Sequence, residues 1–386
     1  MDTDRLRDAV AAREAAFLDE LAEMVNIDCG SYSPEGVNRI VDRCERRFRA
    51  SGWEVDRRAH RAGDEEPQLG DLLVGTLRGA GGVRVLLVGH TDTVFDDGTA
   101  AERPFRIEGG RAFGPGVSDM KGGLLAGFFA TQALQDLGLD GFGHITYVCN
   151  PDEEIGSVFS GPVIRELAAE HDVAYVLEGG RENGDFVSAR KGVTDYRVTV
   201  HGRAAHAGVE PQKGRNAIAQ AAALVTDVHA LRDRWAGVSV NVGTITGGTR
   251  INVVPAVCSF EIDLRAPDLR SLEDAESEIE RVCGTSTMPD VTIDVRRESW
   301  HRPMEKTAAV TTQVERAIGF AAALGFDLRD AATGGASDAN TIAAAGTPVI
   351  DGLGPIGGDD HAPGEWLDLT SIVPRTALVA ALIGLP

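Results

Sequence analysis

Cysteine is scarce in this sequence, and the few cysteines form no recognisable pattern. Among 386 residues there are five, Cys29, Cys44, Cys149, Cys258 and Cys283, with no Cys-x-x-Cys pair. An odd number of widely spaced cysteines does not suggest a disulfide framework. We therefore expect all five thiols to be reduced, and none has sequence neighbours that would activate a thiolate.

Positive charge and long apolar runs are lacking too. The chain has 38 Lys and Arg against 59 Asp and Glu, a formal net charge of −21, which disfavours nucleic acid and anionic membranes as partners. An anionic substrate is not excluded, because a few local arginines can reverse the field in a cleft. No apolar run has the length of a membrane span, and Met1–Arg7 has no signal-peptide core. We expect a cytoplasmic protein.

The chain is long enough for two domains, and its hydrophobic content of 43% is ordinary for a globular protein. Outside residues 193–303, apolar strands alternate with helical patterns, as in α/β folds. The expected strands are 53–57, 71–77, 83–88, 144–149, 173–177 and 348–351. The expected helices are 3–27, 38–50, 119–137, 158–170, 307–324 and one from about 369.

Residues 193–303 have a pattern of their own. Their expected order is β-α-β-β-α-β, the ferredoxin-like arrangement, and their length is that of a domain. We therefore predict a first domain made of residues 1–192 and 304–386, with residues 193–303 inserted as a second domain.

An acidic segment at the end of one apolar strand points to a functional site. Asn150-Pro151-Asp152-Glu153-Glu154-Ile155-Gly156-Ser157 follows the strand 144–149. Three adjacent carboxylates repel one another unless cations or protons neutralise them. Such a triplet alone is typical of a solvated loop, but open α/β sheets bind ligands at strand ends.

Four other segments carry residues of the kind that bind metals. They contribute His90 with Asp92, Asp119, Glu178, and His361. His90 and Asp92 point the same way in an extended segment, and a carboxylate beside a histidine commonly fixes its tautomer. With Glu153 and Glu154, these residues suit two divalent ions of zinc type that share one bridging acid. Gly122 and Gly123 inside a predicted helix indicate close packing there.

The segments GHTDTV, GPGVSDMKGG, NPDEEIGS and LEG, in this order, resemble the di-zinc peptidases that include carboxypeptidase G, aminoacylase, acetylornithine deacetylase and succinyl-diaminopimelate desuccinylase. The resemblance covers nearly the whole chain and is nearest to the carboxypeptidase G type. It implies a split α/β catalytic domain, with a zinc-peptidase-type mixed sheet flanked by helices, and an inserted ferredoxin-like dimerisation domain.

The resemblance also implies a role for each residue of the site. It implies two zinc ions per chain, held by His90, Asp119 and Glu178 on one ion and by Asp119, Glu154 and His361 on the other. Cobalt and manganese suit the same ligands. Asp92 would orient His90, and Glu153 would be the general base. The family often has a cis peptide after the bridging aspartate, here Asp119-Met120, which the sequence alone does not show.

In the inserted domain, the resemblance singles out a histidine and an asparagine. His206 in Gly-Arg-Ala-Ala-His-Ala-Gly would enter the active site of the partner subunit and stabilise the tetrahedral intermediate, which implies a homodimer formed through the inserted domain. Asn252 would lie near the carboxylate of the substrate. A lone histidine and a turn asparagine are otherwise most often structural.

Further residues are candidates for binding a small peptide or N-acyl amino acid. Arg265 and Arg302 are alternatives for the terminal carboxylate, because a guanidinium can pair with it through two parallel hydrogen bonds. Lys191 at the domain junction is a third candidate. Gly335 and Ser337 belong to a Gly-Gly-Ala-Ser-Asp-Ala loop expected at the cleft floor, where Ser337 would also cap the next helix.

The function expected first is that of a di-zinc carboxypeptidase that releases a C-terminal acidic residue, such as glutamate, from N-acyl or short peptide substrates. An N-acyl-amino-acid deacylase of the acetylornithine or succinyl-diaminopimelate kind would use the same metals and base. A catalytically silent zinc-binding dimer is a third reading. No predicted ligand or base is missing from the sequence, which favours an enzyme.

Overall fold

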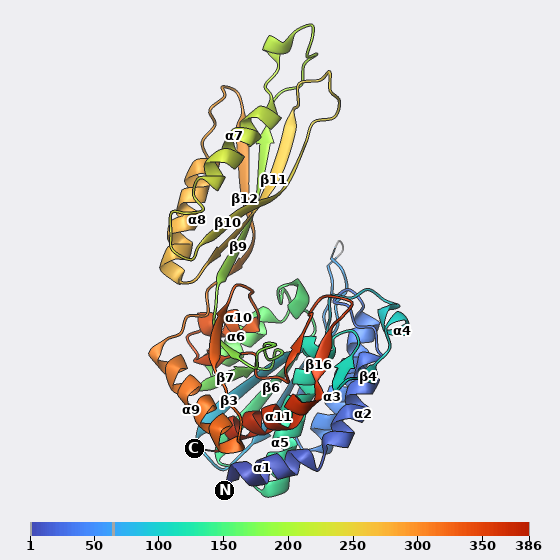
Figure 1. The fold of residues 1–386 in the computed structure, drawn as a ribbon. Helices are drawn as coiled ribbons and strands as arrows, with labels where there is room; N and C mark the ends of the chain where they lie inside the picture. Colours follow the sequence, from blue (N-terminus) through green and yellow to red (C-terminus); the bar gives the residue numbers. More distant parts are fainter. Residues whose placement is uncertain (1, 64–65, 386) are drawn as a thin grey trace. The chain divides into compact units, whose positions relative to one another are not determined.

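The computed structural model describes residues 2–63 and 66–385 and divides the chain into two units (Figure 1). The first contains the residues up to Ser188, Lys306–Ala332 and the residues from Ser337 onward, and the second contains Ala189–Glu305 and Thr333–Ala336. The second unit thus extends beyond the expected 193–303 at both ends and gains the short segment 333–336. Backbone hydrogen bonding explains the gain, because Lys191 N–H donates to the Thr333 carbonyl at 3.0 Å.

A six-stranded mixed sheet forms the centre of the first unit, in the order β1-β2-β6-β3-β7-β14. Its strands are β1 (Glu54–Arg58), β2 (Leu72–Arg78), β3 (Val83–His90), β6 (Phe142–Asn150), β7 (Val173–Val176) and β14 (Val349–Ile350). β3 pairs in parallel with β6 on one side and with β7 on the other, and His90 lies opposite Asn150. The carboxyl ends of these three strands therefore meet at one edge of the sheet.

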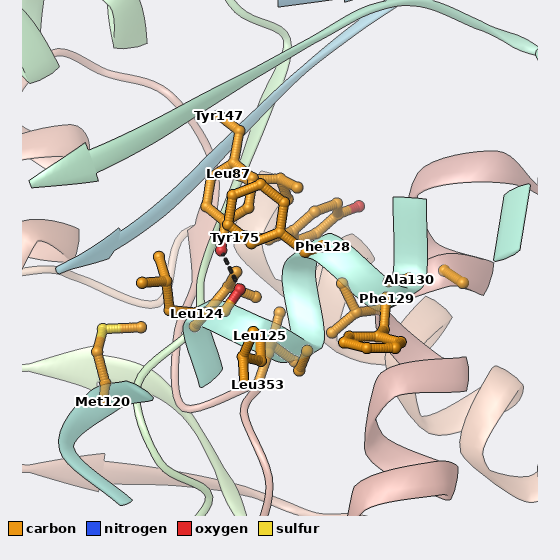
Figure 2. Close-up of a cluster of buried hydrophobic side chains, with 14 of the residues drawn as sticks. Leu87, Met120, Leu124, Leu125, Phe128, Phe129, Ala130, Tyr147, Tyr175 and Leu353 are labelled. Carbon is orange, nitrogen blue, oxygen red and sulfur yellow. Dashed lines mark hydrogen bonds between the residues drawn. The ribbon is translucent and has the colours of Figure 1, made fainter. Parts of the chain in front are cut away.

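Helices surround this sheet, and one of them lies in the hydrophobic core. They are α1 (Asp2–Ala11), α2 (Glu14–Val25), α3 (Pro34–Ala50), α4 (Thr99–Glu102), α5 (Gly123–Leu137), α6 (Gly161–Ala169), α9 (Ala308–Leu324), α10 (Asp338–Ala344) and α11 (Leu369–Gly384). Figure 2 shows α5 packed among buried apolar side chains, where Tyr147 Oη donates to the Leu124 carbonyl at 2.7 Å. Among the described residues, no helix is both long and apolar enough to cross a membrane.

The long helices and buried strands lie close to their expected ranges, with three kinds of difference. The helix expected over 3–27 is two helices. The one expected over 119–137 is regular only from α5 onward, after a kinked segment, η1 (Val117–Gly122), in which Asp119 and Met120 have non-helical backbone angles. Six short strands were not expected: β4 (Arg106–Glu108), β5 (Arg111–Phe113), β8 (Phe186–Arg190), β13 (Asp330–Thr333), β15 (Gly357–Gly358) and β16 (Trp366–Asp368). Strands of two to five residues are too short to show a clear alternation.

The second unit has the element order β-α-β-β-α-β around a four-stranded antiparallel sheet. Its elements are β9 (Gly192–His201), the 3-10 turn η3 (Pro211–Lys213), α7 (Ala217–His229), β10 (Ser239–Gly247), β11 (Val257–Ala266), α8 (Leu269–Cys283) and β12 (Thr292–His301). Alternate residues of β9, Tyr196, Val198 and Val200, are buried in a core shared with α7 and α8. The sheet order β10-β11-β9-β12 leaves β10 and β12 as edge strands.

Candidate metal centre

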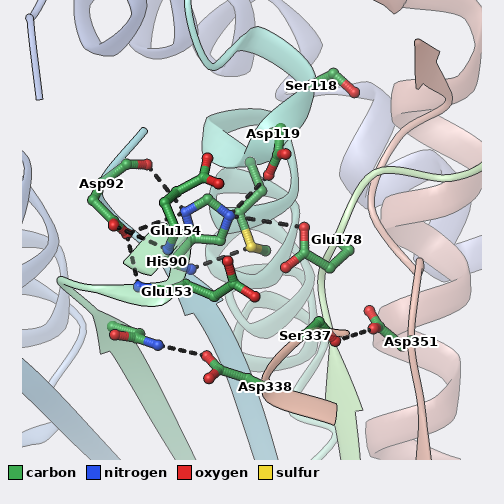
Figure 3. A network of polar contacts seen from close by, with 12 residues as sticks. His90, Asp92, Ser118, Asp119, Glu153, Glu154, Glu178, Ser337, Asp338 and Asp351 are labelled. Carbon is green, nitrogen blue, oxygen red and sulfur yellow. Dashed lines mark hydrogen bonds and ion pairs between the residues drawn. The ribbon is translucent and has the colours of Figure 1, made fainter. Parts of the chain in front are cut away.

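Four of the predicted ligands, His90, Asp119, Glu154 and Glu178, meet at the edge where β6, β3 and β7 end (Figure 3). His90 is the last residue of β3, and Glu178 lies two residues after the end of β7. The turn after β6 contains a short 3-10 helix, η2 (Glu153–Ile155), which carries the two adjacent glutamates. Asp119 comes from η1, where the peptide bond to Met120 is cis.

Asp119 lies between the two predicted histidines. Its Oδ1 is 2.9 Å from His90 Nε2, and its Oδ2 is 3.0 Å from His361 Nε2. Glu178 Oε2 is 3.8 Å from the same His90 nitrogen, and Glu154 Oε2 is 3.2 Å from the same His361 nitrogen. The five residues thus form two groups that share Asp119, each with one imidazole nitrogen and two carboxylates.

The backbone fixes which nitrogen of His90 faces this cluster. His90 Nδ1 lies 3.0 Å from the Asp92 carbonyl oxygen, which can only accept, so Nδ1 carries the proton. Nε2 is therefore the nitrogen that faces the carboxylates of Asp119 and Glu178. Burial lowers the pKa of His90, but the charge of Glu178 and the hydrogen bond to Asp119 outweigh it and raise that pKa well above its usual value. Without a metal ion, Nε2 thus holds a proton more readily than a free imidazole does, and a cation bound there would take the place of that proton.

A second observation, made at Glu154, also indicates that these residues fit divalent metal ions. Its side chain is 5% exposed, and Oε1 is buried without a hydrogen-bond partner among the described residues. Burial and the charge of Asp119 raise the pKa of Glu178 to about 8. Hydrogen bonds to Asp119 and Glu154 raise the pKa of His361 to about 11. Imidazole nitrogens and carboxylate oxygens that need cations are the donor set of zinc-type ions.

Asp92 does more than the expected orientation of His90. Its carboxylate accepts the backbone N–H groups of Glu153 and Glu154, each at 3.2 Å, and the Ser31 hydroxyl at 2.7 Å. Asp92 thereby fixes the turn that carries both glutamates. Burial and the charge of Glu178 raise the pKa of Glu153 well above its usual range, so this carboxyl holds a proton more readily than an exposed one.

Glu365 supports the backbone at Asp119, the predicted bridging residue, and was not identified from the sequence. This carboxylate is 1% exposed and accepts three backbone N–H groups, from Gly116 at 2.8 Å, Ser118 at 2.8 Å and Asp119 at 3.0 Å. Burial raises its pKa to about 7 although the three donors lower it. Glu365 therefore ties the chain after His361 to the turn that presents Asp119. Its only sequence signal is its position four residues after His361.

The two helical glycines have the close contacts that the sequence predicted. A Cβ atom on Gly123 would lie 1.7 Å from the Leu177 carbonyl oxygen, and one on Gly122 would lie 2.4 Å from Leu367 Cδ1. The start of α5 is therefore in backbone contact with the end of β7, next to Glu178. Larger residues at these positions would push the Asp119 turn away from that strand.

A second hydrogen-bond network supports the turn between Asn150 and Ser157, which carries Glu153 and Glu154. The sequence did not predict this network either. Asp338 is 3% exposed and accepts from Ser157 Oγ at 2.6 Å and from Asn150 Nδ2 at 2.6 Å. It joins the N-terminus of α10 to both ends of the turn between Asn150 and Ser157. All three residues occur in the motifs described above, but a buried network between distant segments has no pattern in the sequence.

His206 and Asn252 lie together in the second unit. Ala207 N–H donates to the Asn252 carbonyl at 3.0 Å, and both side chains are in exposed segments. His206 Nδ1 accepts the N–H groups of Gly208 and Val209, each at 3.2 Å. The neutral ring must then carry its proton on Nε2, which makes this nitrogen a hydrogen-bond donor.

The other predicted binding residues already have protein contacts. Arg265 donates to Asp263 from Nη2 at 2.9 Å and to the Gly334 carbonyl from Nη1 at 2.8 Å, so its guanidinium is largely engaged. The guanidinium of Arg302 lies 5.1 Å from the centre of the Trp300 ring, and Lys191 Nζ donates to the Gly237 carbonyl at 2.6 Å. All of these residues belong to the second unit.

Gly335 and Ser337 have different surroundings within their shared loop. Gly335 belongs to the second unit, where its carbonyl accepts from Arg190 Nη1 at 3.0 Å. Ser337 belongs to the first unit and is buried. Its hydroxyl accepts from Ala339 N–H in a capping box of α10 and donates to Asp351 at 2.7 Å. This hydroxyl serves the helix cap, which favours a structural role over substrate binding.

An α/β fold with histidines and carboxylates gathered at the carboxyl ends of its strands is the architecture of a metallohydrolase. Residues 86–384 match the model of peptidase family M20/M25/M40, and the chain belongs to this family. The resemblance drawn from the four motifs and the predicted α/β fold class are thereby confirmed.

Proteins named for different activities are similar to this chain in sequence or in fold. Carboxypeptidase G2 of Pseudomonas sp. (strain RS-16) is 30% identical over 378 residues, which cover 97% of this chain and 90% of that protein. Acetylornithine deacetylase of Proteus mirabilis (strain HI4320) is 31% identical over 221 residues, 53% of this chain and 55% of that protein. Aminopeptidase PepT from Bacillus cereus has the same fold, with a TM-score of 0.81 at 23% identity over 96% of this chain and 98% of that one.

Proposed function

We propose that this protein is a metal-dependent carboxypeptidase that releases a C-terminal amino acid, glutamate or a similar acidic residue, from N-acyl or short peptide substrates. The observation that carries the proposal is the position of Asp119, with one carboxylate oxygen toward His90 Nε2 and the other toward His361 Nε2. The similarity to carboxypeptidase G2 over 97% of the chain supports the reaction type.

Two zinc-type ions, with cobalt or manganese as alternatives, would be held by His90, Asp119, Glu154, Glu178 and His361. They would supply Lewis acidity toward a water molecule and toward the scissile carbonyl. Glu153 takes the proton from the attacking water and returns it to the nitrogen of the leaving amine. Asp92 keeps Glu153 in place through its hydrogen bond to the Glu153 N–H. The raised pKa of Glu153 suits a group that must both take and return a proton.

The second unit would supply substrate recognition and the dimer contact. We assign His206 as a donor to the developing oxyanion in the partner subunit's site, because its Nδ1 accepts backbone bonds and leaves Nε2 as donor. Asn252 lies on the adjacent segment. Arg265 or Arg302 binds the substrate carboxylate, and Arg265 would have to exchange its contact with Asp263 to do so. The edge strand β10, with Ile245 52% exposed, supports association of two second units.

An N-acyl-amino-acid deacylase is the second candidate function. The similarity to acetylornithine deacetylase over 53% of the chain favours it, and the same metals and base would serve. A panel of N-acyl amino acids and dipeptides separates the two, measured with zinc-loaded protein: one series varies only the C-terminal residue, and a second varies only the acyl group. A carboxypeptidase of the proposed type prefers Glu or Asp, whereas a deacylase prefers one amino-acid product and a small acyl group. A protein that binds zinc and cleaves no member would be a silent dimer.

The role of His206 across a dimer has its own experiment. Two inactive variants, His206→Ala and Glu153→Gln, are mixed under conditions of verified subunit exchange. If His206 acts in the partner's site, each mixed dimer has one site with both groups intact, and activity partly returns. If it acts within its own chain, every site lacks one group and activity stays absent. A fully active monomer in solution would rule out the dimer proposal.

A further inference from the structure

Two cavities of the first unit lie side by side along the glutamate turn. One, of about 290 Å³, is lined by residues that include Val94 and Glu154. The other, of about 480 Å³, is lined by residues that include Val158 and Phe159. Tyr32 and Ile155 line both cavities, so the two are neighbours, and together they are here called the Tyr32 furrow. Together they have the size of a small-molecule site.

The walls of the Tyr32 furrow present exposed apolar side chains among polar ones. Tyr32 is 64% exposed, Val94 41% and Val158 66%, and all three line the furrow. Phe159 forms an edge-on pair with His60, with ring centres 4.8 Å apart. Large apolar side chains left exposed together in a hollow are typical of a binding surface, because isolated exposed side chains would be scattered.

The furrow also has a definite charge. Asp96 and Asp97 lie at the rim of its first cavity, and among the described lining residues of either cavity there is no Lys or Arg. A ligand carboxylate would be repelled there, whereas an uncharged or cationic group would not. An amide substrate of the proposed kind always has a carboxylate on its amino-acid side, whereas its acyl side needs none. Its acyl side is therefore the side that suits this furrow.

The position of the furrow fits the same half of the substrate. Ile155 directly follows Glu154, so a chain that lies over Ile155 reaches the predicted metal ligands at one end. From there the second cavity extends the path past Val158 and Phe159.

We propose that the Tyr32 furrow binds the acyl side of the substrate and selects extended apolar acyl groups that are uncharged or end in a cation. This specificity rests on the proposed amide hydrolysis, which supplies the two chemically different halves of the substrate.

The first test measures kcat/KM for one amino acid carrying acetyl, butanoyl, hexanoyl and octanoyl groups. Full burial of a methylene changes a transfer constant about fourfold, so half-burial in an open furrow gives about twofold. The octanoyl compound should therefore be cleaved about 50-fold more efficiently than the acetyl compound. A flat dependence on chain length would overturn the proposal.

Two variants separate the furrow from general hydrophobicity. Val158→Asp places a carboxylate in the far half of the furrow and should reduce the octanoyl-to-acetyl ratio at least about fivefold. Val83→Asp is the matched control, because Val83 is 51% exposed and begins β3 at the end opposite His90. Equal ratios in the two variants would refute the assignment.

The charge of the rim is tested with a succinyl compound, whose acyl group ends in a carboxylate. It should be cleaved about tenfold less efficiently than the butanoyl compound, which has the same number of carbons. Replacing both rim acids, Asp96→Asn with Asp97→Asn, should narrow this gap. A preference for the succinyl compound would overturn the charge argument.

Calorimetry with the Glu153→Gln variant measures how tightly the compounds of the acyl series bind when no turnover takes place. The same rise in affinity with chain length is expected, and its absence would refute the furrow. If affinity rises while the wild-type protein cleaves no compound of the series, the furrow stands and the proposed amide hydrolysis fails.

Discussion

Replacing Glu365 by Gln tests whether a residue outside the predicted ligand set controls the metal centre. Glu365 accepts three N–H groups, one of them from Asp119 itself. Glutamine keeps one oxygen, which can still accept from Ser118 and Asp119, but its NH₂ group then faces the N–H of Gly116. Two donors face each other, and one buried N–H is left without an acceptor.

The expected cost follows from those contacts. A hydrogen bond to a charged acceptor contributes about 1.5–3 kcal/mol, and a stranded buried N–H costs a similar amount, so we expect a total of about 2–3 kcal/mol. Part of this cost lowers stability, and part weakens the hold on Asp119. Changes to groups that orient metal ligands typically reduce metal affinity by about 10- to 100-fold.

Zinc competition against a chromogenic chelator measures the affinity, and thermal melts with and without zinc measure the stability. Glu108→Gln is the control, because the Glu108 side chain is 76% exposed on β4. Glu108→Gln should match the wild type in both assays. If Glu365→Gln also binds zinc with wild-type affinity, the three backbone contacts do not position Asp119, and the reasoning is wrong.

Three further predictions concern the site and the pH dependence of stability. Glu153→Gln should lower turnover by about two to four orders of magnitude at unchanged metal content; loss of metal would make Glu153 a ligand. Elemental analysis should give about two ions per chain, and His90→Ala should reduce this number; one ion at saturation would contradict the two groups. Burial lowers the pKa of His144 and His171, so the stability they contribute is present above about pH 6.5 and lost as the pH falls below it. His171→Gln should flatten the decline in Tm below pH 6.5, whereas His201→Gln, at an exposed position, should not.

The sequence places the predicted metal ligands better than the residues that support them, for a physical reason. His90 and Glu178 end apolar strands, so local pattern and strand direction were enough to place them at one sheet edge. Glu365 contacts the Asp119 turn across 246 residues, and a lone acid carries no sign of such a partner. Gly123 was predicted only in part. Its position in a helix predicted close packing, but the fold was needed to identify Leu177 as its neighbour.

The helix cap made by Ser337 was predicted, but its bond to Asp351 and the bond of Arg265 to the Gly334 carbonyl could not have been. Both residues match positions expected to bind substrate, yet each side chain is held by groups that only the folded chain brings near. A motif identifies a residue type at a position, whereas the availability of its hydrogen bonds depends on tertiary neighbours.

The insertion of the second unit into the first has a consequence for biosynthesis. During translation, His90, Asp119, Glu154 and Glu178 leave the ribosome before the second unit, and His361 and Glu365 leave after it. An early ion meets an open ligand set and a bridging turn that still lacks its carboxylate acceptor. If these residues hold metal ions as proposed, the complete ligand set exists only near the end of synthesis, and tight metal binding would mark chains that have been finished.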